Sequence, residues 1–137
     1  MKIHHLRNAT FIIESGSSYI LVDPMLSGVG KLPPFAYLRH KLKRNPLVPL
    51  PKSATTTLEQ VTHCLVTHSQ KWGIESLTHA DHFDKSGKSF LQKNKIPIAC
   101  RQQDASYMKK NGIIVEASVE AYVDAINKYC YELELEG

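Results

Sequence analysis

TFIIESGSSYILVDP, residues 10–24, contains two β-like segments, Thr10–Glu14 and Tyr19–Val22, separated by the turn residues Gly16-Ser17-Ser18. Two such segments around a turn signal predict a β-hairpin. The second segment runs directly into Asp23-Pro24. Proline has no N–H for sheet pairing and disfavours helical geometry at the preceding residue, so we expect pairing to stop here, with Asp23 extended. A third β-like segment, Ile3–Arg7, precedes the hairpin.

Beyond residue 60, strand-like and helix-like segments alternate. Apolar runs predict strands, a capping aspartate and a terminal glycine predict helix ends, and an apolar stripe at helical spacing predicts a last helix. The expected strands are Val61–Thr67, Ile96–Cys100 and Ile113–Glu116, and the expected helices run from Asp84 to Asn94, over Gln102–Asn111, and from Val119 to Lys128. An alternating, edge-like strand to Glu136 would follow, although the stripe would also let the last helix continue. This order predicts an α/β (α+β) fold, a mixed β-sheet with helices on one face.

Residues 24–58 differ in character from the rest of the chain. They hold six of the seven prolines, so little regular structure is expected apart from a short helix at Phe35–Lys43. Long loops inside a compact domain are usually functional or mobile. The N-terminal strands alone could not form a core, so we expect residues 1–137 to be one domain with a Pro-rich basic loop, not two domains and a linker.

The composition excludes two classes of protein. With 42% hydrophobic and 22% charged residues, the chain is expected to be neither disordered nor a membrane protein. The N-terminus lacks the apolar region of a signal peptide, and the three cysteines have no short spacing. These features predict reduced thiols in a cytoplasmic protein.

The net charge of +4 is distributed unevenly. Pro24–Leu58 contains six cations and no acid, whereas Ile114–Gly137 contains six acids and one cation. The basic stretch could hold nucleic acid or a phosphorylated substrate. We favour a solvated loop, and no nucleic-acid partner, because aromatic residues are sparse there and no nucleic-acid motif accompanies the charge.

The clearest chemical signal is a group of metal-binding residue types between residues 68 and 82. It comprises His68, His79, Asp81 and His82, and imidazole and carboxylate groups are the usual ligands of zinc and related divalent ions. His79, Asp81 and His82 can converge only in a tight turn, because neither a helix nor a strand places all three on one face. The alternative is a polar helix start in which Asp81 caps backbone amides.

These residues resemble a known signature. His68, followed by His79-Ala80-Asp81-His82, is similar to the Thr-His-x-His-x-Asp-His motif of the metallo-β-lactamase superfamily. Four further segments resemble its branch of lactonase-like phospho-sugar enzymes: Arg7-Asn8-Ala9-Thr10, Ile20-Leu21-Val22-Asp23-Pro24-Met25, Asn45-Pro46-Leu47-Val48 and Asp81-His82-Phe83-Asp84. The resemblance spans roughly residues 1–112 and implies one half of that superfamily's αββα sandwich.

The resemblance also implies a metal site. His68 and His79 would bind a first metal, and Asp81 and His82 would bind a second. Asp23 would not bind a metal itself, but its carboxylate would orient one of the ligands. In that family the metals, zinc or another divalent ion, polarise a scissile carbonyl or phosphoryl group and lower the pKa of a bound water to about 7. Asp81 would then belong to the catalytic centre of a hydrolase of an ester, a lactone or a phosphoester.

The chain departs from the family pattern in two places. One residue normally separates the first two histidines, whereas Ser69–Thr78 lie between them here. Either the signature is interrupted by an insertion or His79 takes the first place, with Asp81 where the second histidine should stand. The family's second half supplies three further ligands, and no histidine follows His82. We therefore expect the isolated chain to have an incomplete metal site and little turnover.

The alternative function is a non-catalytic half-fold that acts as a binding or assembly module. In either case a sheet with helices on one face leaves its other face bare. Its apolar residues would be Phe11, Ile13, Ile20, Val22 and Leu65. A two-fold partner of the same sequence is the commonest cover for such a face, so we expect a homodimer.

Overall fold

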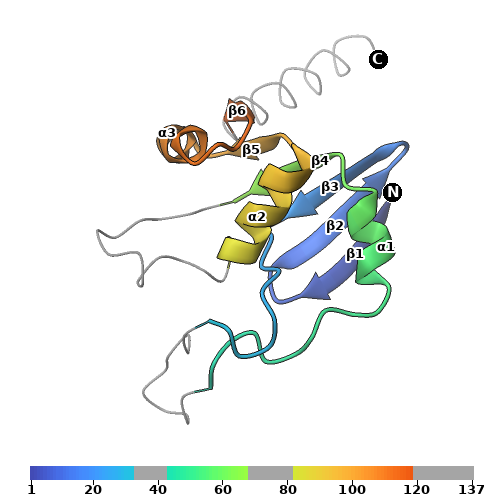
Figure 1. Ribbon diagram of the computed structural model, residues 1–137. Coiled ribbons are helices and arrows are strands. Elements are labelled where there is room, and N and C mark those ends of the chain that lie inside the picture. Colours follow the sequence, from blue (N-terminus) through green and yellow to red (C-terminus); the bar gives the residue numbers. More distant parts are fainter. Residues whose placement is uncertain (33–42, 68–81, 119–137) are drawn as a thin grey trace, which may run out of the picture.

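A six-stranded mixed sheet forms the centre of the computed structural model, which describes residues 1–32, 43–67 and 82–118 (Figure 1). The strands follow one another across the sheet in chain order: β1 (Lys2–Arg7), β2 (Thr10–Ser15), β3 (Ser18–Val22), β4 (His63–Val66), β5 (Ile98–Cys100) and β6 (Val115–Ser118). The pairs β1–β2 and β2–β3 are antiparallel, and the pairs from β3 to β6 are parallel. The predicted mixed sheet is confirmed.

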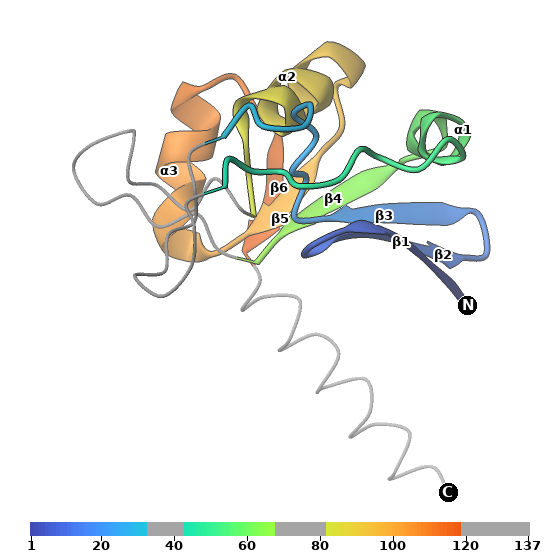
Figure 2. The ribbon, with the colours of Figure 1, turned by 90° about the horizontal axis from the view of Figure 1, so that it is seen from below.

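Each parallel connection among the described residues contains a helix. These are α1 (Ala54–Glu59), α2 (Lys85–Asn94) and α3 (Gln102–Lys110). Because the strands advance in one direction across the sheet, right-handed crossovers place all three helices on the same face. Figure 2 shows α1 and α2 together on one side of the strands. The expectation of helices on one face is confirmed.

The predicted hairpin is β2–β3. Its strands pair from Phe11 with Val22 to Ser15 with Ser18. Gly16 occupies the left-handed region at φ 58°, which glycine reaches without steric cost. Pairing in β3 ends at Val22, directly before the Asp23-Pro24 dipeptide.

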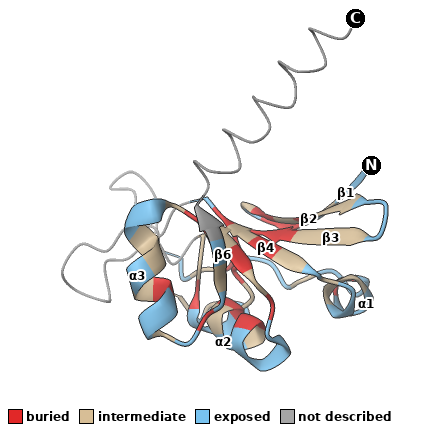
Figure 3. Ribbon diagram, turned by 90° about the horizontal axis from the view of Figure 1, so that it is seen from above, coloured by how far each residue is buried: buried red, intermediate tan, exposed pale blue. Residues whose placement is uncertain are grey.

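The core lies between the sheet and the helices. Alternate strand residues face the helices and are buried with Leu91 of α2 and Met108 of α3: Ile12, Leu21, Cys64, Val66, Ile98 and Cys100. The intervening residues face the other side of the sheet, where most strand positions are only half-buried (Figure 3). The strand register places Phe11, Val22 and Leu65 in one row across that face.

The predicted helix ends agree with the structure at α2 and α3. The side chain of Asp84 accepts a hydrogen bond from Gly87 N at 2.7 Å and caps α2. Gly112 follows α3 in the left-handed region at φ 68°. Both ends are set by local signals, an aspartate at the N-cap and a glycine beyond the C-cap.

Two sequence predictions are corrected. The Pro-rich loop does not extend to residue 58, because α1 begins at Ala54; the three consecutive threonines of α1 are poor helix formers and conceal it. The last described strand begins at Val115, because Ile113 N–H closes α3 by donating to Met108 O at 3.1 Å. The expected helix at Phe35–Lys43, the helix from Val119 and the alternating tail lie wholly or largely outside the described residues.

None of the helices in the described ranges has both the length and the apolar character needed to cross a membrane.

Candidate functional site

Loops gather at the edge of the sheet formed by the carboxyl ends of the parallel strands. β3 leads into the loop that begins at Asp23, and β4 leads into the segment that ends at the start of α2. Figure 1 shows the chain after β3 passing beside the first turn of α2. In open α/β sheets, ligands bind outside the carboxyl ends of the strands, so a site is expected at this edge.

Asp23 lies at the centre of this edge and is 3% exposed. Its Oδ1 accepts a hydrogen bond from Thr67 N at 2.8 Å, and its Oδ2 accepts one from Thr67 Oγ1 at 2.7 Å. The predicted extended geometry of Asp23 is wrong, since its φ is +47°. Its carbonyl accepts from Thr10 Oγ1 at 2.5 Å and from Met25 N at 2.8 Å, while its N–H donates to Leu65 O at 2.9 Å. These contacts fix a bend that the following proline alone would disfavour.

His82 is brought to the same carboxylate from the segment before α2. Its Nδ1 lies 2.8 Å from Asp23 Oδ2, and the side chains of His82 and Asp23 are 22% and 4% exposed. A carboxylate can only accept, so this contact requires a proton on Nδ1, and in the neutral ring the lone pair is then on Nε2. Asp23 therefore sets both the tautomer and the orientation of the ring.

The first turn of α2 is joined to the loop after β3. Asp84 accepts from Gly87 N and, through Oδ2, from Ser27 N at 2.8 Å. Ser27 Oγ also donates to Ser86 Oγ at 3.1 Å. A Cβ at Gly87 would lie 1.9 Å from Pro24 O, so the loop approaches the helix more closely than any side chain permits. The backbone on both sides of the Asp23–His82 contact is thus held in place.

Arg7 is the cation within this network, with 2% of its surface exposed. Its guanidinium donates to Met25 O from Nε at 3.1 Å and from Nη2 at 2.7 Å, and also to Ser27 O and Val48 O. Burial lowers the pKa of Arg7 from its usual value, and the negative charge of Asp84 opposes that shift. The guanidinium keeps its charge, because an arginine is not deprotonated in proteins.

The structure brings together two of the residues predicted for the site. Asp23 and His82 are in contact, whereas His68, His79 and Asp81 lie outside the described residues. Within the described ranges, no group of three or more histidine, cysteine, aspartate or glutamate residues is arranged to hold a metal ion.

Sequence reasoning missed the residues that support Asp23 and His82. Thr10, Thr67, Ser27 and Arg7 act through hydrogen bonds to side chains and to backbone carbonyls distant in sequence. Arg7 and Thr10 belong to the Arg7-Asn8-Ala9-Thr10 segment that carried part of the family resemblance, which is the available signal for them.

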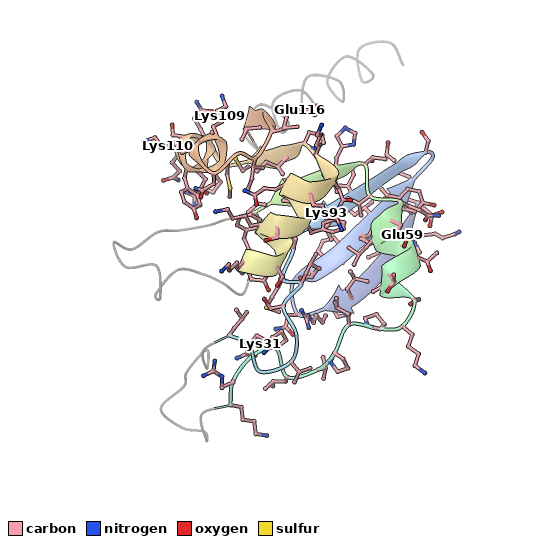
Figure 4. The ribbon with its side chains drawn as sticks, viewed as in Figure 1. Lys31, Glu59, Lys93, Lys109, Lys110 and Glu116 are labelled. Carbon is pink, nitrogen blue, oxygen red and sulfur yellow. The ribbon has the colours of Figure 1, made fainter. Side chains whose placement is uncertain are left out.

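The described cations of the basic loop lie on the surface. Lys31, Lys43, Arg44 and Lys52 are exposed, and Arg44 Nε donates to Gly30 O at 2.8 Å. Figure 4 shows Lys31 on this loop, well apart from Lys109 and Lys110 on α3. The interpretation of the loop as a solvated surface without nucleic acid stays a prediction.

Comparison with known proteins adds a functional context. No protein-family model matches the chain. The chain is 34% identical over 112 residues to the UPF0173 protein YddR of Bacillus subtilis (strain 168), which corresponds to 82% of this chain and 41% of that protein.

Two solved structures share the fold. A possible metal-dependent hydrolase from Veillonella parvula DSM 2008 matches with a TM-score of 0.68 and 30% identity, over 84% of this chain and 41% of that chain. The isothiocyanate hydrolase from Delia radicum gut bacteria matches with a TM-score of 0.68 and 28% identity, over 85% and 41%. The chain therefore spans less than half the length of these relatives, and over that span it is similar to a possible metal-dependent hydrolase and to an isothiocyanate hydrolase.

Proposed function

We propose that this chain carries a metal-binding part of a hydrolase of the metallo-β-lactamase superfamily, acting on an ester, a lactone or a phosphoester. The contact between His82 Nδ1 and Asp23 Oδ2 at 2.8 Å carries the proposal. A histidine that binds a metal almost always donates its other ring N–H to a carboxylate, a carbonyl or a water. The similarity to a possible metal-dependent hydrolase supports the same class of chemistry.

The donor chemistry of these residues fits a zinc-like divalent ion. With the proton on Nδ1, the lone pair of His82 is on Nε2, which is the form of imidazole that coordinates metals. His68, His79 and Asp81 would supply the further nitrogen and oxygen donors. Such an ion would provide Lewis-acid activation of a scissile carbonyl or phosphoryl group.

The chain's own residues would prepare His82 for this role. Asp23 holds the ring at Nδ1, and Thr67 holds Asp23 through both of its carboxylate oxygens. Because the Asp23 side chain is only 4% exposed, little water competes for that carboxylate. The hydrogen bonds are strengthened by the low local dielectric.

Isothiocyanates are a further candidate substrate class. The chain is similar to an isothiocyanate hydrolase over 85% of its length. An isothiocyanate, like an ester, presents an electrophilic carbon to an attacking water. It therefore belongs in the same substrate panel as esters, lactones and phosphoesters.

Zinc binding measured by isothermal titration calorimetry tests the proposal. We expect the wild-type chain to bind zinc weakly and the His79→Ala/His82→Ala double variant to bind none. His63→Ala is the matched control, since His63 Nδ1 contacts Thr62 Oγ1 at 3.0 Å, away from Asp23. Unchanged zinc binding in the double variant would contradict the assignment, and a wild-type chain that binds no zinc would favour the assembly-module alternative.

A further inference from the structure

We propose that Arg7 is the positioning residue that fixes the Asp23–His82 contact, acting through the backbone on both sides of it. The inference rests on the proposed function, in which His82 is a metal ligand. Asp23 and His82 are 59 positions apart, and a separate segment carries each of them. Something must therefore hold the two segments at hydrogen-bond distance.

On the Asp23 side, Arg7 acts through Met25. Two guanidinium nitrogens, Nε and Nη2, donate to Met25 O at 3.1 and 2.7 Å. The N–H of Met25 in turn donates to Asp23 O at 2.8 Å and to Thr10 Oγ1 at 3.1 Å. The turn from Asp23 to Met25 is thus closed by the Met25 N–H, and Arg7 holds Met25 in place.

On the His82 side, Arg7 acts through Ser27 and Asp84. Arg7 Nη2 donates to Ser27 O, and Ser27 N donates to Asp84 Oδ2 at 2.8 Å. Asp84 stands two positions after His82 and is 3% exposed. One residue, Ser27, therefore bridges two buried groups of opposite charge, and that bridge ties the start of α2 to the loop that carries Asp23.

The geometry requires an arginine. The fork of Arg7 reaches three carbonyls, those of Met25, Ser27 and Val48, from three nitrogens at once. A lysine carries one ammonium nitrogen and cannot span three separated acceptors, although it keeps the charge near Asp84. Arg7→Lys therefore separates the effect of the fork from the effect of the charge, whereas Arg7→Met removes both.

Two readouts test the role of Arg7. The first is the protonation pattern of the His82 ring nitrogens, observed by NMR in the metal-free protein at one fixed pH. We expect predominantly Nδ1–H in the wild type, a mixture of tautomers in Arg7→Met and an intermediate pattern in Arg7→Lys. The second is the zinc dissociation constant, which should rise about 10–100-fold in Arg7→Met, as for other residues that orient a metal-binding histidine.

Arg44→Met is the matched control. Arg44 belongs to the Pro-rich loop that also contains the partners of Arg7, but it is exposed and donates to Gly30 O. It should leave both readouts unchanged. Unfolding in urea, measured on every variant, separates loss of stability from loss of positioning.

The inference is overturned if a folded Arg7→Met or Arg7→Lys protein keeps the wild-type tautomer and the wild-type zinc affinity. If Arg7→Met does not fold, Arg7→Lys decides, because it retains the buried charge. Failure of the proposed function looks different: the wild type would bind no zinc, while the NMR pattern of His82 would still respond to Arg7.

Discussion

Asp23 combines an uncommon backbone conformation with a buried carboxylate. A positive φ in a residue other than glycine costs on the order of 1–3 kcal/mol and persists only where the surroundings determine it. Here two backbone hydrogen bonds and the hydroxyl of Thr10 fix the turn. The strain turns the carboxylate toward Thr67 and His82. Strained residues of this kind cluster at functional sites, which agrees with the proposed role of Asp23.

Cys64 is buried in β4 close to that carboxylate. Burial raises the pKa of its thiol well above the ordinary value, and the negative charge of Asp23 raises it further. The thiol of Cys64 is therefore protonated in the folded protein at neutral pH. It is a packing residue of the core and a poor nucleophile.

The raised pKa of Cys64 predicts a loss of stability in alkali. A thiol in the unfolded chain ionises near about pH 8.5, whereas the folded state keeps its proton to higher pH. The folded state then binds more protons than the unfolded state, so the free energy of unfolding falls with pH above that point, by at most about 1.4 kcal/mol per pH unit.

Urea unfolding at pH 7.5 and 9.5 checks this prediction. The wild type should lose more stability between these pH values than Cys64→Ala, because both proteins share every other titrating group. Native Cys64 should also resist iodoacetamide until the protein unfolds. Equal losses of stability in the two proteins, or rapid alkylation of native Cys64, would show that Cys64 is not a buried, protonated thiol in the folded state.

At the scale of elements, α2 and the loop after β3 are fitted to each other at Gly87. Alanine would raise helix propensity by about 1 kcal/mol. Its Cβ would, however, stand 1.9 Å from Pro24 O and 2.9 Å from Pro24 C, both backbone atoms that cannot simply rotate away. We therefore expect Gly87→Ala to destabilise the protein by a net ~2 kcal/mol, because overpacking of this kind outweighs the propensity gain.

The midpoint of urea unfolding measures the effect of Gly87→Ala. Gly28→Ala is the matched control, since its Cβ would meet only Lys31 Cγ at 3.7 Å, an ordinary contact. The control should unfold near the wild-type midpoint. A Gly87→Ala protein as stable as the control would mean that α2 does not pack this closely on the loop.

The elements that could be predicted from the sequence are those with local signals. The hairpin is predicted by Gly16, the start of α2 by Asp84 and the end of α3 by Gly112. α1 was missed because its threonines carry no helical signal and its stability comes from burying Ala54 against the sheet. Tertiary packing overrides propensity in such a short helix.

The site could be predicted only in part, for a similar reason. The role of Asp23 in orienting a metal ligand was predicted only from resemblance to a family, and its contact with His82 was not predicted, since residues 59 positions apart show no local pattern. Arg7 was missed because its hydrogen-bond partners are backbone carbonyls, and a carbonyl is present at every position. Burial of a cation can be recognised only once the fold is known.

At the scale of the whole molecule, the two faces of the sheet differ. The helices and the described part of the loop after β3 lie on one side of the strands (Figure 2). The other face carries the apolar residues predicted from the sequence: Phe11, Ile13, Ile20 and Leu65 are half-buried, and Val22 is buried. The described part of the Pro-rich loop, residues 24–32 and 43–53, lies with the helices and does not cover this face.

A second copy of the chain is the cover that we predict for this face. Each 100 Å² of apolar surface removed from water stabilises an assembly by about 2.5 kcal/mol, so an apolar sheet face is a strong driving force for association. Two sheets packed face to face would lie about 10 Å apart with their side chains interdigitated. A two-fold arrangement presents the same sheet face from both partners, so Ile13 and Ile20 would each meet apolar side chains.

Light scattering at tens of micromolar protein measures this directly. We expect a mass of twice 15.4 kDa for the wild type, and the monomer mass for an Ile13→Glu/Ile20→Glu variant, because two buried carboxylates per partner would have to be desolvated without counter-charges. Lys52→Glu, which changes an exposed residue of the loop on the helix side, is the control and should stay dimeric. A wild-type mass near 15.4 kDa would exclude the dimer. Circular dichroism would establish that the double variant is folded, so that a loss of mass reports on the sheet face and not on unfolding.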